Sequence, residues 1–185
     1  MALALNVIVI MLEVRGLSLS FPERKWKTLV FYTQISNVIA FISSILFVLL
    51  GQLPFVTAVR YLSVCMLIMT FFVTTCVLIP MGGDPKKLLC SGNCLYHHVL
   101  CPIISAVSYI IFEGHVISAA IILLPVAVTL VYGIIMLYLN AIERVDGPYP
   151  FFRVHNQTVT ATILWVIVLL TATCLISWAV WLIAK

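Results

Sequence analysis

The chain has 185 residues, of which 64% are hydrophobic and only 9% are charged, and its mean hydropathy is +1.22. A soluble domain carries about a quarter charged residues, so this composition excludes an ordinary soluble globular protein. The net charge of +4 does not indicate nucleic-acid binding, because the basic residues lie in short connectors between apolar runs.

Five runs contain no Asp, Glu, Lys or Arg, and the shortest of them is 23 residues long. A helix needs about 20 apolar residues to cross the hydrocarbon core, so each run is long enough to span a bilayer. The sequence therefore predicts an all-α integral membrane protein with little mass outside the lipid. The runs are residues 28–59, 61–83, 88–112, 114–142 and 154–184.

The first apolar segment, residues 3–12, is followed closely by Glu13 and Arg15. It lacks a basic region before it and a small-residue cleavage pattern after it, which argues against a cleaved signal peptide. We expect a spanning helix over residues 2–20, whose two charged side chains reach the interface or pair with each other.

Connectors rich in charge, Gly and Pro separate the later segments. The connector around Trp26 combines charge with an aromatic ring, as is typical of a membrane interface. The pattern predicts a single transmembrane domain, residues 1–185, folded as a six-transmembrane-helix bundle. Its expected helices cover about residues 2–20, 28–50, 55–79, 96–112, 117–140 and 158–183.

The basic residues are distributed unevenly between the two ends of such a bundle. Connectors 1–2, 3–4 and 5–6 hold eight of the ten Lys and Arg residues, and only Arg60 and Lys185 belong to the other side. The positive-inside rule then predicts a multi-pass protein of the cell membrane with these three connectors in the cytoplasm. A cytoplasmic position would keep Cys90 and Cys94 reduced.

Polar residues cluster at the start of the second predicted helix. Thr33, Ser36 and Asn37 follow i+3 and i+4 spacing and share one helix face, with Gln34 beside it. Thr33 follows Lys27 by six residues, which places it about 9 Å along the helix from the interface. Polar side chains inside a membrane are candidates for a functional site.

Two histidines, His97 and His98, open the fourth predicted helix from the same side of the membrane, at a depth similar to that of Thr33. A hydroxyl and an imidazole at matched depth are the minimum for nucleophilic catalysis on an acyl carbon. Asn37 is placed to donate a hydrogen bond to an oxyanion. The alternative is that the helix-two polar residues bind a neighbouring helix and the histidines cap helix four.

A zinc site is a second alternative, because thiolate and imidazole are the ligands that zinc prefers. Cys90, Cys94, Cys101 and either histidine fall along one stripe if helix four begins early. The turn-like residues 91–93 interrupt that stripe, and the second ligand pair has poor spacing. We therefore expect neither a metal nor another cofactor.

Three short segments carry a resemblance to a known family. Trp26-Lys27 followed by Phe31-Tyr32-Thr33-Gln34-Ile35-Ser36-Asn37 resembles the second helix of the androgen-induced protein family and its bacterial six-pass relatives. His97-His98-Val99-Leu100-Cys101-Pro102 is similar to their fourth helix, where a histidine precedes a proline. Tyr149-Pro150-Phe151-Phe152 resembles the motif that introduces their last helix.

The resemblance implies a membrane threonine hydrolase that cleaves fatty acid esters of hydroxy fatty acids, with Thr33 as nucleophile and a histidine as base. His97 stands five residues before Pro102, as in the animal proteins, and His98 stands four before it, as in the bacterial ones. The predicted partner is a membrane lipid or fatty acid ester. Gln34, Asn37 and Tyr149 are the predicted substrate-binding residues.

We expect the substrate to enter sideways between helices two and four, with the Tyr149 connector as a lid. Aromatic residues are candidates to line that cleft, namely Tyr109, Tyr132, Phe151 and Phe152. A small transporter or lipid-binding protein that uses the same polar cluster without catalysis is the alternative function. Glu113 and Glu143 lie at ends of the expected helices, so acidic residues are absent from the helix centres, which argues against a proton-coupled carrier.

Overall fold

The computed structural model describes residues 1–113 and 118–184, and every element of regular secondary structure within them is a helix. Six of the described segments are long and apolar enough to cross a membrane, so the protein is a six-span helical membrane protein, as the sequence predicts. These spans are Ala2–Pro22, Tyr32–Leu50, Pro54–Leu78, Gly92–Glu113, Ala119–Ala141 and Val159–Ile183.

The second span begins later than the sequence predicts, at Tyr32 instead of residue 28. Helix α1 (Ala2–Arg24) ends at Lys25, whose φ is +50°, and the 3-10 helix η1 (Lys25–Val30) leads to α2 (Tyr32–Leu50). Two tyrosine hydroxyls accept from the first N–H groups of α2, at 3.0 Å from Tyr132 to Tyr32 and 3.3 Å from Tyr149 to Thr33. These bonds satisfy backbone donors that a helix start leaves without partners.

The third span is continuous and the fourth is built from short pieces. Helix α3 (Pro54–Val73) runs into the π-helical turn η2 (Thr74–Leu78). The fourth span starts four residues earlier than predicted. It consists of α5 (Gly92–Cys94), η3 (Leu95–Leu100), α6 (Cys101–Val107) and η4 (Ser108–Glu113).

A short helix before the fourth span, α4 (Pro85–Cys90), was not predicted. Asp84 caps it by accepting a hydrogen bond from the backbone N–H of Lys86 at 2.9 Å. Pro85 occupies the first helical position, where its missing N–H costs nothing. The connector between spans three and four is therefore partly helical.

The fifth span consists of η5 (Ala119–Ile122) and α7 (Leu123–Ala141), and its predicted start at residue 117 lies outside the described residues. Two further 3-10 turns, η6 (Pro150–Phe152) and η7 (Val154–Asn156), shape the connector to α8 (Val159–Ile183). Thr158 caps α8 through a 3.2 Å bond from the Ala161 N–H to its hydroxyl.

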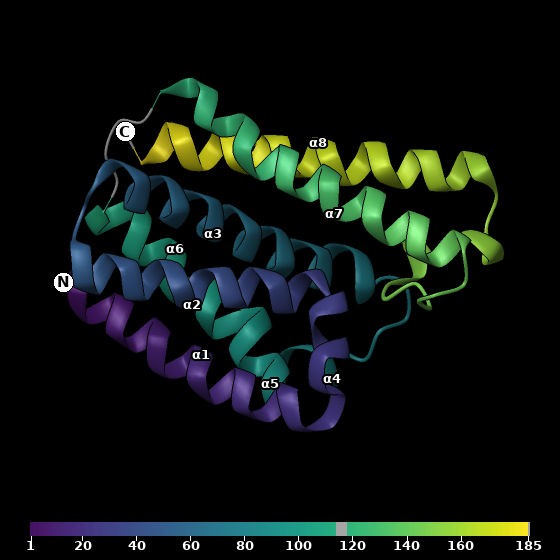
Figure 1. The fold of residues 1–185 in the computed structure, drawn as a ribbon, viewed down its shortest axis with the longest axis horizontal. Coiled ribbons are helices and arrows are strands. Elements are labelled where there is room, and N and C mark those ends of the chain that lie inside the picture. Colours follow the sequence, from purple (N-terminus) through teal and green to yellow (C-terminus); the bar gives the residue numbers. More distant parts are fainter. Residues whose placement is uncertain (114–117, 185) are drawn as a thin grey trace.

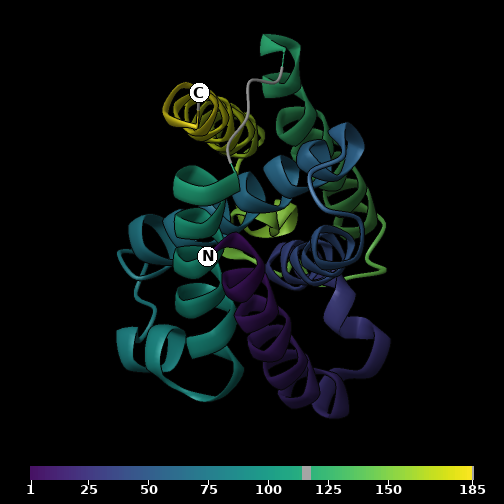
Figure 2. The same cartoon turned by 90° about the vertical axis from the view of Figure 1, so that its left-hand side faces the viewer.

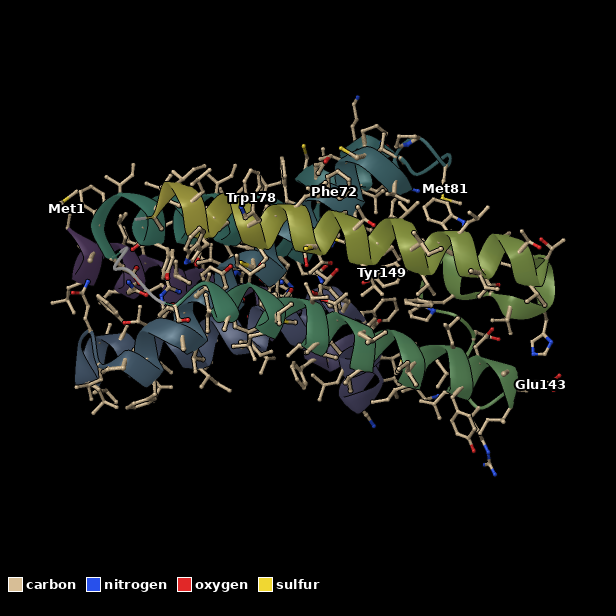
Figure 3. All side chains as sticks on the ribbon, turned by 90° about the horizontal axis from the view of Figure 1, so that it is seen from above. Met1, Phe72, Met81, Glu143, Tyr149 and Trp178 are labelled. Atoms are coloured by element: carbon tan, nitrogen blue, oxygen red, sulfur yellow. The ribbon has the colours of Figure 1, made fainter. Side chains whose placement is uncertain are left out.

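The six spans form two groups along the bundle. Figure 1 shows α7 and α8 running side by side along one side of α3, with α2, α6 and α1 on the other side. Seen end-on in Figure 2, α1 leaves the bundle axis at an angle. In Figure 3, Met81 and Glu143 mark the end of the molecule opposite Met1. We call the end with connectors 1–2, 3–4 and 5–6 the connector end.

An ion pair is buried at the other end of the bundle. The Arg60 guanidinium donates to both carboxylate oxygens of Glu113, at 2.8 and 3.0 Å, and the side chains are 0% and 2% exposed. Asn6 and Ser108 also donate to Glu113. The network joins α1, α3 and the fourth span, so Arg60 is an interior residue and not an interfacial charge.

Candidate functional site

Thr33, the predicted nucleophile, lies in the first turn of α2 at the connector end. Its hydroxyl is 3.1 Å from the phenol oxygen of Tyr149, and both residues are buried. The connector between spans five and six thus folds back under the start of α2. The structure brings these two predicted site residues together.

Aromatic packing and one glycine hold that connector in place. The Tyr149 ring stacks on Phe151 with centroids 5.2 Å apart, and Phe151 packs on Trp165 of α8 at 5.5 Å. A Cβ added to Gly147 would lie 2.7 Å from the backbone of Phe152, which is too close for any side chain. Glycine at this position lets the connector turn back tightly enough to reach Thr33.

A cavity of about 80 Å³ adjoins the pair formed by Thr33 and Tyr149. It lies between α2, the end of α3, α7, α8 and the connector, and its walls are mostly apolar. Leu130 and Ile134 line it on α7 and are themselves exposed. The cavity therefore reaches the outer surface of the bundle. In Figure 3, Tyr149 lies between the ribbons of α7 and α8.

The position of this cavity differs from the predicted cleft between helices two and four. Tyr132, Phe151 and Phe152 line it, as the sequence suggests. Tyr109 does not, because it packs in a second cluster against Tyr61, with ring centroids 6.1 Å apart. The fourth span contributes no lining residue within the described part of the chain.

The histidines make their hydrogen bonds away from this cavity. His97 Nδ1 lies 3.1 Å from the Gln34 amide nitrogen, and its Nε2 lies 3.6 Å from a carboxylate oxygen of Glu13. His98 Nδ1 lies 2.7 Å from the Leu88 carbonyl oxygen, which makes it a donor to the preceding segment. Among the described residues, no hydrogen bond joins Thr33 to either imidazole.

Two other polar residues of the second helix, Ser36 and Asn37, form hydrogen bonds within the bundle. Asn37 donates to the Thr33 carbonyl oxygen at 2.6 Å and to the His97 carbonyl oxygen at 3.4 Å. Ser36 and Thr70 of α3 share a 2.9 Å hydroxyl contact. The bonds of Asn37 to His97 and of Ser36 to Thr70 join α2 to neighbouring helices, as the alternative interpretation expects, whereas the bond of Asn37 to Thr33 lies within α2. The matched depth of helix two and the start of helix four, however, is present in the structure.

The expectation that Glu13 reaches the interface or pairs with Arg15 is wrong. Glu13 is fully buried and faces His97, while Arg15 is exposed. Glu13 is buried because it stands on the face of α1 that packs against the bundle, where buried residues recur at intervals of three and four. A usable signal was present in the sequence, since polar or small residues follow this interval at Asn6, Glu13, Gly16 and Ser20, with the apolar Val9 between the first two.

The zinc alternative is not assembled in the described residues, where no three His, Cys, Asp or Glu side chains come close enough to share a metal ion. Cys90 is exposed and Cys101 is buried, so the predicted stripe does not converge. Asn93, one of the residues that interrupt the stripe, donates to the Ser20 hydroxyl of α1 at 2.8 Å.

The protonation of Tyr149 limits what the pair can do. Burial of this phenol, which lies outside the spanning segments, raises its pKa above the ordinary value of about 10. It therefore stays neutral in the physiological range. A neutral phenol donates or accepts a hydrogen bond but does not serve as a general base for Thr33.

No protein-family model, curated protein or solved structure matches this chain. The resemblance to the androgen-induced proteins therefore stays a prediction from short motifs.

Proposed function

We propose that this protein binds a membrane lipid, with an acyl chain in the cavity and an oxygen-bearing group at the pair of Thr33 and Tyr149. The main support for this proposal is that the buried hydroxyl pair adjoins an apolar cavity that reaches the outer surface. Apolar walls with a few placed polar groups are typical of ligand sites. Exposed Leu130 and Ile134 on α7 support entry from the lipid.

The polar pair fits a neutral acceptor such as an ester or carboxylic acid carbonyl. Tyr149 and Thr33 hold two hydroxyl hydrogens between them, and only one is needed for their mutual contact. The other is available to a carbonyl oxygen. Because neither side chain is cationic, the pair offers no specific attraction for a phosphate.

Photo-crosslinking of the purified protein in lipid nanodiscs tests this proposal. The probe is a long-chain fatty acid with a diazirine on its chain. Gly133 lines the cavity and an added Cβ there meets nothing within 4 Å, so Gly133→Leu places a side chain in a wall of the cavity where the Cβ has room. The matched control is Val131→Leu, on the same helix but 55% exposed and outside the cavity.

We expect crosslinks in the α7 and α8 segments that line the cavity, reduced several-fold in Gly133→Leu and unchanged in Val131→Leu. Equal labelling of both variants and the unmodified protein, or crosslinks confined to the other end of the bundle, would contradict lipid binding in this cavity.

A second candidate function, hydrolysis of a lipid ester of the fatty acid ester of hydroxy fatty acid type, is supported by the Thr33 hydroxyl on the cavity wall and by the family resemblance. Thr33 Oγ1 would attack the acyl carbon, the ester C–O bond would break, and the alcohol would leave with a proton. Water would then release the acid from the acyl-threonine.

Hydrolysis requires a base that contacts the Thr33 hydroxyl. For His97 or His98 to be that base, its ring must leave its present hydrogen-bond partner, Gln34 or the Leu88 carbonyl. Labelling by a fluorophosphonate probe tests it. Labelling lost in Thr33→Ala and in one histidine variant supports hydrolysis. Fluorophosphonate labelling that persists in Thr33→Ala would contradict hydrolysis by Thr33. If the fatty acid probe still crosslinks in that case, lipid binding without catalysis is the function that is supported.

A further inference from the structure

We infer that Glu13 and His97 form a proton-binding site inside the membrane, in which the two side chains together hold one proton. This site lies between α1 and the fourth span, and neither of its two side chains lines the lipid cavity. It does not depend on lipid binding in the cavity, and it shares His97 with the two candidate bases for ester hydrolysis.

Both side chains are completely buried, and their polar atoms lack hydrogen-bond partners on the facing side. Glu13 Oε1 and Oε2 and His97 Nε2 make no hydrogen bond, and the shortest distance between the two groups is 3.6 Å. Such a pair is unusual, because buried polar groups in proteins are nearly always hydrogen-bonded. Ionisable residues within a membrane are rare and mark functional sites.

Charge decides the protonation of the pair. An ionised carboxylate without a hydrogen bond or a counter-ion is very costly in a medium of low dielectric constant. Among the side chains that the structure describes, His97 is the one group able to carry a positive charge within 4 Å of the Glu13 carboxylate. The pair is therefore neutral overall, either as carboxylic acid with imidazole or as carboxylate with imidazolium. Both forms contain the same one proton.

The neighbouring titratable groups do not supply a competing charge. The Cys101 thiol of α6 interacts with the Glu13 side chain, but a thiol is only a weak donor and brings no positive charge. His98 lies next to His97, but its ring is bonded to the Leu88 carbonyl. From α2, the uncharged Gln34 faces the other ring nitrogen of His97.

Gly16 shapes the site. It lies one turn after Glu13 on the buried face of α1, and an added Cβ would overlap the His97 imidazole. The His97 ring occupies the space that a side chain at position 16 would need. This close approach brings the imidazole to the carboxylate, and together with the Gln34 contact it holds the ring in one orientation.

Two spectroscopic measurements on the purified protein in nanodiscs at about pH 8.5 test the inference. In water, free glutamate (pKa about 4.3) and histidine (about 6.5) would both be deprotonated at this pH. Infrared spectroscopy detects a protonated carboxyl group, and 15N NMR of labelled histidine reports whether the His97 ring is neutral or imidazolium. His97→Asn assigns its signal.

Either of two results supports the proton site: a protonated carboxyl band that Glu13→Gln abolishes, or an imidazolium signal assigned to His97. Asp84→Asn, which removes an exposed carboxylate, is the matched control and leaves the band unchanged. Neutral imidazole at His97 together with no protonated carboxyl band would overturn the inference. The NMR arm uses the unmodified protein, so the conclusion does not depend on folding of Glu13→Gln.

Discussion

The phenol oxygen of Tyr149 lies 3.1 Å from the hydroxyl of Thr33, although the two residues are 116 positions apart in the chain. The same phenol oxygen lies 3.3 Å from the Thr33 N–H and accepts from it. A connector outside the spans thus completes the first turn of a spanning helix.

Tyr149→Phe removes this hydroxyl and leaves the buried polar groups of Thr33 without their partner. We expect the free energy of unfolding to fall by about 1–3 kcal/mol, the usual cost of an unsatisfied buried group. Denaturant or thermal unfolding in a defined detergent measures it. Tyr138→Phe, on an exposed tyrosine of α7, is the control. An equal effect of both substitutions would contradict the assignment.

The raised pKa of Tyr149 predicts a pH dependence with a definite sign. The folded protein holds the phenol proton more tightly than the unfolded chain, whose tyrosine titrates near pH 10. This stabilisation is complete below about pH 10 and is lost as the pH rises above it. Stability should therefore fall more steeply in alkaline solution for the unmodified protein than for Tyr149→Phe. Parallel curves would contradict burial of this phenol.

Breaking the buried ion pair is expected to be costly. Arg60→Ala leaves the Glu113 carboxylate buried without its counter-ion, and loss of one partner of such a pair typically costs about 3–5 kcal/mol. Unfolding measurements on Arg60→Ala and on Arg15→Ala, which removes an exposed arginine, give the comparison. A change below about 0.5 kcal/mol in Arg60→Ala, the range of surface substitutions, would contradict the buried pair.

Gly147→Ala tests the tight turn of the connector. The new methyl group would overlap the backbone of Phe152, so we expect Tyr149 to move away from Thr33 and the connector to become more sensitive to limited proteolysis. Gly133→Ala is the matched control, because nothing lies within 4 Å of its added Cβ. Equal proteolysis rates in both variants would contradict the role of Gly147.

The number of spans and their approximate bounds were predictable because the charged residues interrupt the apolar runs, and the energetic penalty for charge in hydrocarbon is large. Local backbone detail was less accessible. The sequence placed the start of helix two at residue 28, whereas α2 begins at Tyr32. That start depends on hydrogen bonds that the first N–H groups of α2 donate to the hydroxyls of Tyr132 and Tyr149, which a local sequence pattern does not contain.

The candidate site was predictable only in part. The motif around Thr33 and the Tyr149 connector identified two residues that the structure joins. The sequence predicted that His97 and Thr33 lie at similar depth in the membrane, but it did not predict on which side of α2 the His97 ring lies. That side depends on the packing of Gly16 against the imidazole and on the burial of Glu13. Charge alone had suggested an interfacial position for Glu13.

The tyrosine hydroxyls at the start of α2 also constrain the order in which the protein is completed. Tyr132 comes 100 residues after Tyr32, and Tyr149 comes 116 residues after Thr33. During synthesis the second span is made long before these partners exist. The first turn of α2 therefore acquires its final hydrogen bonds only after the fifth span and the following connector have been produced, late in the assembly of the bundle.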